Sequence, residues 1–295
     1  MHDVLIIGGG LAGLSAATAC SQYKLSTLVL SRSIGGGLRE TPIVETLPGI
    51  SPVHGPELAK KLADQAAALG VEFKETEITE VRTGFTLFNL TDHSGEKYKA
   101  KAIIIACGRP VQMLEVAGEE EFLGKGITTR PITDFGQLKD GIVAVHGSSE
   151  KAAMIALWLA NSCARVHLIS SQPRLNTTPI TQDHLNRMLR IEQHLNLGIK
   201  RVSGTLDLES ITPDKGPPIK VTGLVLSESG RAQLSFLKIP VQISDGITVD
   251  SEMKTSHKGI FACGDVLSNK QALPIETVSQ AWRAAESAHK FVRGK

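Results

Sequence analysis

The sequence predicts an α/β protein of two domains, and three observations lead to that prediction. An apolar strand, Val4–Ile7, runs into a glycine turn and a helix start at residues 8–13. A strand, a helix and another strand follow in the middle of the chain, over Gly141–Ile169. Near the carboxyl end, a short apolar strand at 259–263 runs into a Gly-Asp pair. Alternation of this kind builds parallel sheets covered by helices. The predicted fold is therefore two Rossmann-like domains of the three-layer ββα type, the first of them discontinuous.

The amino-terminal turn has the spacing of a pyrophosphate-binding loop. Gly8 permits the sharp turn, Gly10 lets the backbone approach a diphosphate without an intervening Cβ, and Gly13 lets the helix pack against the strand. The helix start adds free N–H groups and partial positive charge. At the far end of the chain, the carboxylate of Asp265 suits the ribityl hydroxyls of FAD. Two unrelated glycine turns are the alternative, but the order and context of both signals favour an FAD site.

The other elements of the first domain follow in order. They are an apolar strand at 26–30, a glycine loop at 35–38, a helix from 55 to 70, a β-meander over 71–98 and a buried strand at 101–108. Where such a fold places an acidic residue for the adenosine ribose, this chain has Ser31 and Arg32, so that hydrogen bond is weaker or comes from elsewhere. We expect an FAD-binding domain at 1–112 and 244–295, and a second, nucleotide-binding-like domain at 113–243.

Composition argues against several classes of function. The 32 Lys and Arg residues against 30 Asp and Glu give a net charge of +2, so no strong field attracts nucleic acid or an acidic membrane. No apolar run approaches the ~20 residues of a membrane helix, and no targeting segment precedes the first strand, so we expect a cytoplasmic protein. The four cysteines lie far apart and none belongs to a C-x-x-C pair, which argues against a local redox dithiol or a ribbon-type zinc site.

Taken together, seven segments resemble the low-molecular-weight thioredoxin reductase family, and their order and spacing along the whole chain make the resemblance specific. The segments are Gly8–Gly13, Gly35–Leu38, Glu45–Gly49, Ile105–Pro110, Val116–Phe122, Gly124–Ile127 and Gly259–Asp265. The resemblance implies a homodimeric flavoprotein with FAD in the first domain and NADPH in the second. We expect the residues that hold FAD to be Gly8, Gly10, Leu11, Ala12, Gly13, Ser31, Arg32, Gly36, Gly37, Leu38, Thr46, Ala106, Gly108, Gly264, Asp265, Glu276 and Thr277.

The redox dithiol of that family is missing. In our alignment Arg130 and Thr133 occupy the two cysteine positions, and neither side chain can form a disulfide or a thiolate beside a flavin. Reduction of thioredoxin by the family's route is therefore not expected. The family's Arg-Gln pair beside the flavin falls on Ile275 and Glu276. A carboxylate at the pyrimidine end would disfavour an anionic reduced flavin; the alternative for Glu276 is a solvent-facing helix start.

The NADPH turn of the family has also changed. The G-x-G-x-x-A motif falls on residues 146–151, where His146 and Ser148 place side chains at positions that should present backbone to phosphate. Glu150 adds negative charge beside an anion site. The basic H-R-R segment that holds the 2′-phosphate reads Ser-Ser-Gln at 170–172. We therefore predict a degenerate NADPH-binding-like domain that no longer binds the nucleotide.

Other candidate side chains receive no catalytic assignment. His54 is either a proton donor to reduced flavin or a helix-capping loop residue. His146 and His167 lack a cysteine or carboxylate at ligand spacing, so no metal is predicted. Trp158 is expected in the core, whereas Trp282 covers either the flavin edge or a dimer contact.

The favoured function is an FAD-dependent oxidoreductase that uses neither a local dithiol nor hydride from NADPH. Electrons would come from a small redox protein such as ferredoxin, or from a small substrate. The alternative is a non-catalytic flavin-binding protein whose second domain binds a partner. A third hypothesis is a reductase that binds NADPH in a new way. The homodimer is expected from the resemblance alone.

Overall fold

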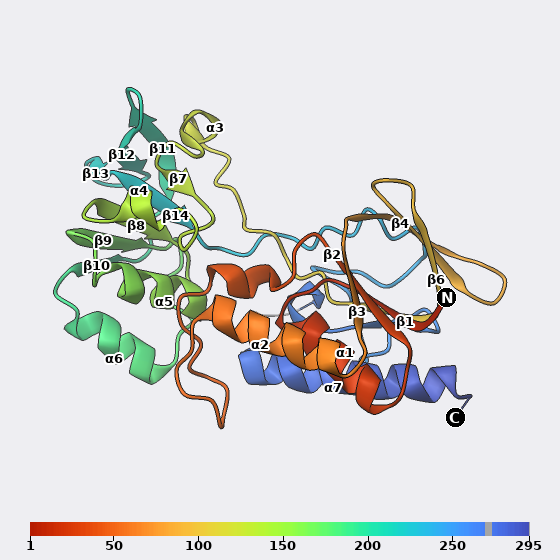
Figure 1. Ribbon diagram of the computed structural model, residues 1–295. Coiled ribbons are helices and arrows are strands. Elements are labelled where there is room, and N and C mark those ends of the chain that lie inside the picture. The colour runs from red at the N-terminus through yellow and green to blue at the C-terminus, as the bar shows by residue number, and fades with distance from the viewer. Residues whose placement is uncertain (269–272, 295) are drawn as a thin grey trace. The chain divides into compact units, whose positions relative to one another are not determined.

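The computed structural model describes residues 1–268 and 273–294, with elements labelled as in Figure 1. The chain forms two compact units: unit 1 comprises residues 1–39, 44–110 and 231–295, and unit 2 comprises residues 40–43 and 111–230. The chain rejoins unit 1 at Arg231, whereas we expect the return at residue 244. The difference arises because Phe236 and Leu237 pack on the unit 1 core, and the Phe236 carbonyl accepts a hydrogen bond from Val81 N–H at 2.8 Å.

A seven-stranded sheet of order β3-β2-β1-β6-β5-β4, with β15 beside β6, forms the centre of unit 1. Five strands pair in parallel, whereas β4, β5 and β6 pair antiparallel. The predicted meander is therefore confirmed for three strands but not for β3, which extends the parallel sheet. The strands are β1 (His2–Ile7), β2 (Thr27–Ser31), β3 (Glu72–Glu75), β4 (Ile78–Thr83), β5 (Phe88–Asp92), β6 (Lys97–Ile105) and β15 (Ile260–Ala262).

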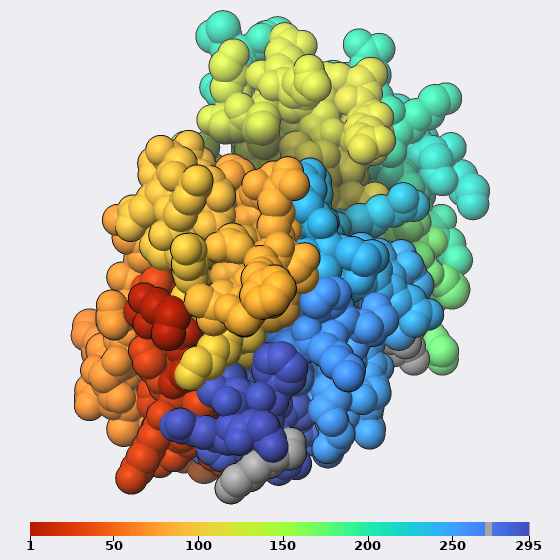
Figure 2. All heavy atoms as spheres, turned by 90° about the vertical axis from the view of Figure 1, so that its right-hand side faces the viewer, coloured from red at the N-terminus to blue at the C-terminus, as the bar shows by residue number. Residues whose placement is uncertain are grey.

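Helices from both ends of the chain pack together on this sheet. Helix α1 (Leu11–Gln22) is buried over most of its length because it contacts β1, β2, α2 (Gly55–Ala68) and α7 (Pro274–Val292). Short 3₁₀ turns follow β2 at η1 (Gly36–Glu40) and β15 at η2 (Gly264–Val266). Amino-terminal residues, red to yellow, and carboxyl-terminal residues, blue, accordingly share one surface of unit 1 (Figure 2).

Unit 2 contains a five-stranded parallel sheet of order β10-β9-β8-β14-β7 and a three-stranded antiparallel sheet, β11-β12-β13. The predicted strand-helix-strand module over 141–169 is confirmed as β8, α5 and β9. The strands are β7 (Ile127–Thr128), β8 (Ile142–His146), β9 (Arg165–Ile169), β10 (Ile191–His194), β11 (Ile199–Gly204), β12 (Leu208–Pro213), β13 (Ile219–Lys220) and β14 (Gly223–Leu226). The helices are α3 (Glu119–Phe122), α4 (Phe135–Leu138), α5 (Glu150–Leu159) and α6 (Pro179–Arg187). Over the described ranges, no helix combines the length and hydropathy that crossing a membrane requires.

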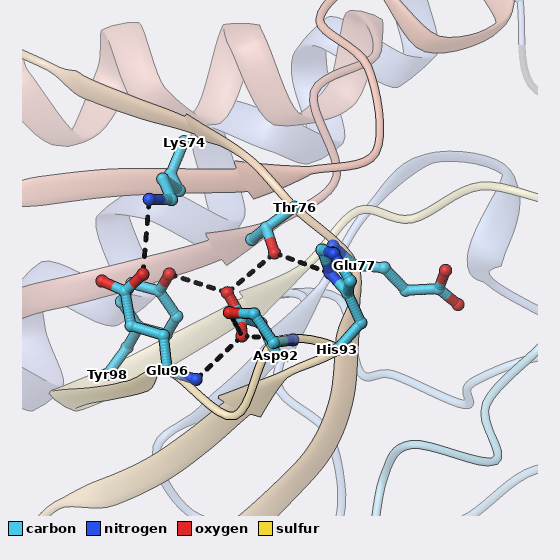
Figure 3. A network of polar contacts seen from close by, with 8 residues as sticks. Lys74, Thr76, Glu77, Asp92, His93, Glu96 and Tyr98 are labelled. Atoms are coloured by element: carbon cyan, nitrogen blue, oxygen red, sulfur yellow. Dashed lines mark hydrogen bonds and ion pairs between the residues drawn. The ribbon is translucent and has the colours of Figure 1, made fainter.

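A buried carboxylate organises the turn between β5 and β6 (Figure 3). Asp92 is 2% exposed, and its Oδ2 accepts hydrogen bonds from Thr76 Oγ1 at 2.8 Å and from Tyr98 OH at 2.9 Å. Asp92 Oδ1 accepts three further hydrogen bonds. They come from the Ser94 backbone N–H at 3.0 Å, the Ser94 hydroxyl at 2.7 Å and the Glu96 N–H at 2.9 Å. Desolvation alone would raise the pKa of Asp92, but these hydrogen bonds hold it well below the usual range. The group therefore ties the meander together as an anion.

Candidate functional site

The turn between β1 and α1 requires glycine at two positions for packing and leaves room at a third. Gly8 has φ +113°, and a Cβ there would lie 2.3 Å from Ala106 O. A Cβ on Gly13 would lie 1.8 Å from Gly8 O, so the helix could not approach the strand. At Gly10, by contrast, the nearest atom to a Cβ would be Gly36 Cα at 3.9 Å. A Cβ at Gly10 would make only ordinary van der Waals contact, so the packing of the chain itself does not require glycine at this position.

That helix start is suited to an anion. Gly10 is the N-cap of α1 and makes no side-chain cap hydrogen bond, and the first turn holds no acidic residue. The first N–H groups of a helix lack partners within the helix, and together with the helix dipole they favour negative charge. The facing turn is also glycine: Gly36 has φ +49°, and no atom lies within 4 Å of a Cβ built on Gly37. These residues fit a pyrophosphate group.

The Gly-Asp turn at the far end of the chain lies against the same helix start. Gly264 has φ +79°, and a Cβ there would lie 2.7 Å from Ala12 Cβ and 3.7 Å from Thr277 Cγ2. Its N–H donates to Gln280 Oε1 at 2.9 Å. The fold therefore brings Asp265 beside the glycine turn, as both halves of an FAD site require.

Sequence analysis assigned no role to Arg109, although it lies in a segment that carries the resemblance. Its guanidinium donates to the carbonyl oxygens of Asp265, at 2.7 Å, and Leu267, at 2.9 Å, and forms an ion pair with Asp245 at 2.8 Å. Only 12% of its side chain is exposed. Arg109 thus joins the end of β6 to the turn that carries Asp265. The residues around Arg109 in the sequence give no sign of these contacts, because Asp265 and Leu267 lie 156 and 158 residues further along the chain.

On the side expected for the ribose, the structure gives Ser31 and Arg32 other partners. Ser31 Oγ accepts from Gly9 N–H and donates to Ser33 O, both at 2.9 Å, so it braces the glycine turn. The exposed Arg32 side chain forms an ion pair with Glu77. Contacts of Ser31 and Arg32 with FAD remain a prediction.

The other predicted FAD residues are spread over the surrounding turns. Glu276 is exposed, and its carboxylate accepts from Leu273 N–H at 3.1 Å at the start of α7, which favours the helix-start alternative. Thr277 is buried beside Gly264. Leu11 and Ala12 lie in the first turn of α1, Leu38 lies in η1, Ala106 and Gly108 follow β6, and the half-buried Thr46 lies between η1 and α2.

Three further side chains were given alternatives. His54 stands at the N-cap position of α2, where its helix-capping alternative places it, but its side chain makes no cap hydrogen bond. Trp158 packs on the unit 2 core with its ring centroid 4.9 Å from that of Phe135, so its core position is confirmed. Trp282 is 41% exposed on α7, and its role remains a prediction.

The corresponding turn of unit 2 already holds a carboxylate. Between β8 and α5, the N–H of Ser148 donates to Glu228 Oε2 at 2.8 Å, and its hydroxyl lies 3.2 Å from the same oxygen. A Cβ on Gly147 would lie 3.5 Å from that oxygen. Glu228 follows β14, the strand beside β8. Sequence analysis missed Glu228, although carboxyl ends of neighbouring parallel strands share one edge, where ligands bind.

Glu150, predicted to add negative charge at the nucleotide turn, also has partners at the start of α6. Its carboxylate accepts hydrogen bonds from Thr178 N–H at 2.8 Å and Thr181 Oγ1 at 2.5 Å, and so caps the start of α6. The start of α5 is capped by Ser149, whose Oγ accepts from Ala152 N–H at 3.3 Å. Glu150 thus lies in the first turn of α5, as expected, and Glu228 is a second acidic group at the nucleotide turn.

At the positions aligned with the redox dithiol, the side chains make polar contacts. Thr133 Oγ1 donates to Glu40 Oε1 at 2.6 Å, and Arg130 pairs with Asp134 at 3.3 Å. All four cysteines are free thiols. Burial raises the pKa of Cys20 to about 12 and that of Cys163 to about 11, so both stay protonated at neutral pH.

The expectation that His167 has no carboxylate partner at ligand spacing is wrong. His167 on β9 has partners in His194 and Glu192 on the neighbouring strand β10, although the sequence spacing shows no such group. His146 stands apart from this cluster, and burial lowers its pKa, which favours the neutral ring.

Comparison with known proteins agrees with this architecture. Residues 2–288 match the family described as pyridine nucleotide-disulphide oxidoreductase. The chain is 30% identical to a thioredoxin reductase of Aquifex aeolicus over 100% of this chain and 94% of the relative, and 31% identical to one of Listeria monocytogenes over 99% and 94%. The crystal structure of Lactococcus lactis thioredoxin reductase superposes with a TM-score of 0.94 at 26% identity and covers 100% of both chains. Thioredoxin reductases are FAD-binding flavoproteins. The chain belongs to the pyridine nucleotide-disulphide oxidoreductase family, and within it resembles the thioredoxin reductases along its whole length.

Proposed function

We propose that this chain is an FAD-dependent oxidoreductase of the thioredoxin-reductase-like group that takes electrons from a redox protein or a small substrate and not from a pyridine nucleotide. The observation that carries the proposal is the contrast between the two glycine turns. In unit 1 the start of α1 is uncapped, its first turn holds no acidic residue, and a Cβ on Gly10 would meet nothing closer than 3.9 Å. In unit 2 the equivalent turn is bonded to the carboxylate of Glu228.

The carboxylate opposes a nucleotide in two ways. It takes the Ser148 N–H, one of the donors that a pyrophosphate would use. It also places negative charge where a second anion would have to bind, and like charges a few ångströms apart repel strongly away from bulk water. The Ser-Ser-Gln segment at 170–172 offers no cation to a 2′-phosphate. These features support loss of both NADPH and NADH.

The residues of unit 1 would hold FAD by complementary chemistry. The first N–H groups of α1 would bind its pyrophosphate, and the Asp265 carboxylate would accept hydrogen bonds from ribityl hydroxyls. Arg109 would act as a positioning residue, because it fixes the backbone of the turn that carries Asp265. Bound FAD supplies the capacity to accept and release electrons, which the protein side chains lack.

Anaerobic spectroscopy tests this function. The purified protein should be yellow, with close to one FAD per chain. Reduced ferredoxin, generated with its own reductase, should bleach the flavin absorbance in amounts stoichiometric with the flavin, whereas dithionite serves as the positive control for reducibility. A protein that binds no flavin contradicts the proposal.

The alternative function, a non-catalytic flavin-binding protein, predicts a different result in the same experiment. Its flavin would be reduced by dithionite but by neither ferredoxin, flavodoxin nor any small donor, and it would show no turnover with an added electron acceptor. A homodimer also remains a prediction, to be checked by light scattering of the flavin-loaded protein.

A further inference from the structure

Away from both glycine turns, three metal-ligating side chains converge on one face of the unit 2 sheet. His167 lies on β9 and is the register partner of Glu192 on the edge strand β10. His194 follows Glu192 by two residues, and side chains two apart on a strand point to the same face. Two adjacent parallel strands therefore present two imidazoles and a carboxylate side by side.

Their spacing matches that of ligands around one ion. His167 Nδ1 lies 3.0 Å from His194 Nε2. The carboxylate of Glu192 lies 3.6 Å from each ring nitrogen, with Oε2 nearest His167 and Oε1 nearest His194. Two ligands of a tetrahedral Zn²⁺, with bonds of about 2.0–2.2 Å, lie roughly 3.3–3.6 Å apart. Small side-chain movements of a few tenths of an ångström would complete the geometry.

We propose that His167, Glu192 and His194 form a site for Zn²⁺ or a similar divalent transition metal in unit 2. Two histidines and one glutamate are a ligand set that zinc uses when it keeps a fourth position open. The sheet holds the ligands: the side chain of His167 is 9% exposed and that of His194 is 20% exposed, whereas Glu192, at 53%, can adjust to the ion.

All three side chains line a pocket of about 560 Å³, which would leave room for a fourth ligand. Its lining includes the three ligands, Ile142, the β12–β13 hairpin with Lys215 and Lys220, and Arg165. Arg165 lies 3.7 Å from Glu192 and competes for its carboxylate, and the two lysines add positive charge. These cations weaken binding of a bare ion but favour an anion as the fourth ligand, which would offset their charge. The site is therefore expected to hold the metal together with a small anion or hydroxide.

Equilibrium dialysis of the full-length, untagged protein against Zn²⁺ tests the proposal. After chelator treatment, the wild type should take up one zinc per chain, measured by mass spectrometry of the metal. Removal of a residue that only orients a ligand typically lowers affinity 10- to 100-fold, so loss of a ligand in Glu192→Gln or His194→Gln should lower it by more than about 100-fold. His184→Gln, on the exposed face of α6, is the matched control and should bind as the wild type does.

Further readouts separate this site from others. Zinc should raise the midpoint of thermal unfolding of the wild type and of His184→Gln but not that of His194→Gln. X-ray absorption should show nitrogen and oxygen ligands, and alkylation of Cys107 should leave the stoichiometry unchanged. Circular dichroism confirms that each variant is folded, and two independent ligand variants guard against one failing to fold. No stoichiometric zinc in the wild type, or equal affinity in all variants, would show that the two histidines form only a hydrogen bond. Because unit 1 takes no part, this result is independent of the proposed flavin function.

Discussion

Gly13 and Gly10 in the first turn have different roles: the packing of the fold requires glycine at 13, whereas we expect FAD binding to require it at 10. A Cβ at Gly13 would collide with the backbone of Gly8, whereas a Cβ at Gly10 meets nothing closer than 3.9 Å. We expect Gly13→Ala to destabilise unit 1 by about 1–3 kcal/mol or more. Gly10→Ala should leave the apoprotein as stable as the wild type. Its methyl group would push the pyrophosphate away from the N–H groups of α1, and loss of one hydrogen bond to a charged group would weaken FAD binding by about 1.5–3 kcal/mol. Thermal unfolding of the apoprotein and an FAD titration measure the two effects.

Gly136→Ala is the control for these variants, because a Cβ there would have no atom within 4 Å. It should change neither stability nor FAD affinity. Equal FAD affinity in Gly10→Ala and the wild type would mean that the pyrophosphate does not bind against the backbone of Gly10.

Glu228 carries the second prediction at the scale of residues. Glu228→Ala removes the charge from the turn and frees the Ser148 N–H. Affinity for NADH, measured by calorimetry, should rise at least about tenfold above the upper limit that the same measurement sets for the wild type. The reason is that the repulsion between the carboxylate and the pyrophosphate is removed. Glu121→Ala, an exposed glutamate on α3, should leave that limit unchanged. Failure of Glu228→Ala to gain affinity would mean that the carboxylate is not what excludes the nucleotide.

Asp92 makes stability depend on pH in a definite direction. Its folded pKa lies below the ordinary value of about 3.9 that it has in the unfolded chain. Its contribution is therefore complete above about pH 5, where the carboxyl is ionised in both states, and is lost as pH falls from there through the folded pKa. Urea unfolding between pH 7 and pH 3 should show a weaker pH dependence for Asp92→Asn than for the wild type. Asp207→Asn, at an exposed turn, is the control, and a change there equal to that in Asp92→Asn would contradict the assignment.

Among the elements, the turn η2 depends on Arg109. A lysine cannot reproduce the planar guanidinium that contacts Asp265 O, Leu267 O and Asp245 together. We expect Arg109→Lys to weaken FAD binding by about 1.5–3 kcal/mol and to speed flavin release, measured by the return of flavin fluorescence. Arg82→Lys, on the exposed face of β4, should behave as the wild type does. Unchanged flavin release in Arg109→Lys would leave that residue with a purely structural role.

Elements whose signal is local could be predicted from sequence, and those that depend on distant partners could not. A window of a few residues was enough to predict strands β1 and β8 from their apolar runs, and the first turn from Gly8 and Gly13. The contact of Ser148 with Glu228 joins positions 80 residues apart, and that of Arg109 with Asp265 spans 156. Strand β3 was misplaced because pairing is a choice between distant partners, which a strand's own residues do not show.

The same limit explains the histidines. His167 and His194 become neighbours through the register of two strands, not through a ligand motif in the sequence. A parallel pair of strands is joined by a long crossover, here through α6, so the spacing along the chain has no metal-site signature. Strands β8 and β14 likewise pair in parallel, and this pairing brings Ser148, after β8, next to Glu228, after β14.

For the whole molecule, we propose that the glycine turn of unit 1 receives FAD, whereas the related turn of unit 2 is bonded to Glu228 and receives no nucleotide. Anaerobic titration of the flavin-loaded protein with NADPH and NADH tests that statement most directly. We expect a large excess of either nucleotide to leave the oxidised-flavin absorbance unchanged, while dithionite bleaches it fully. Stoichiometric bleaching by either nucleotide would contradict it.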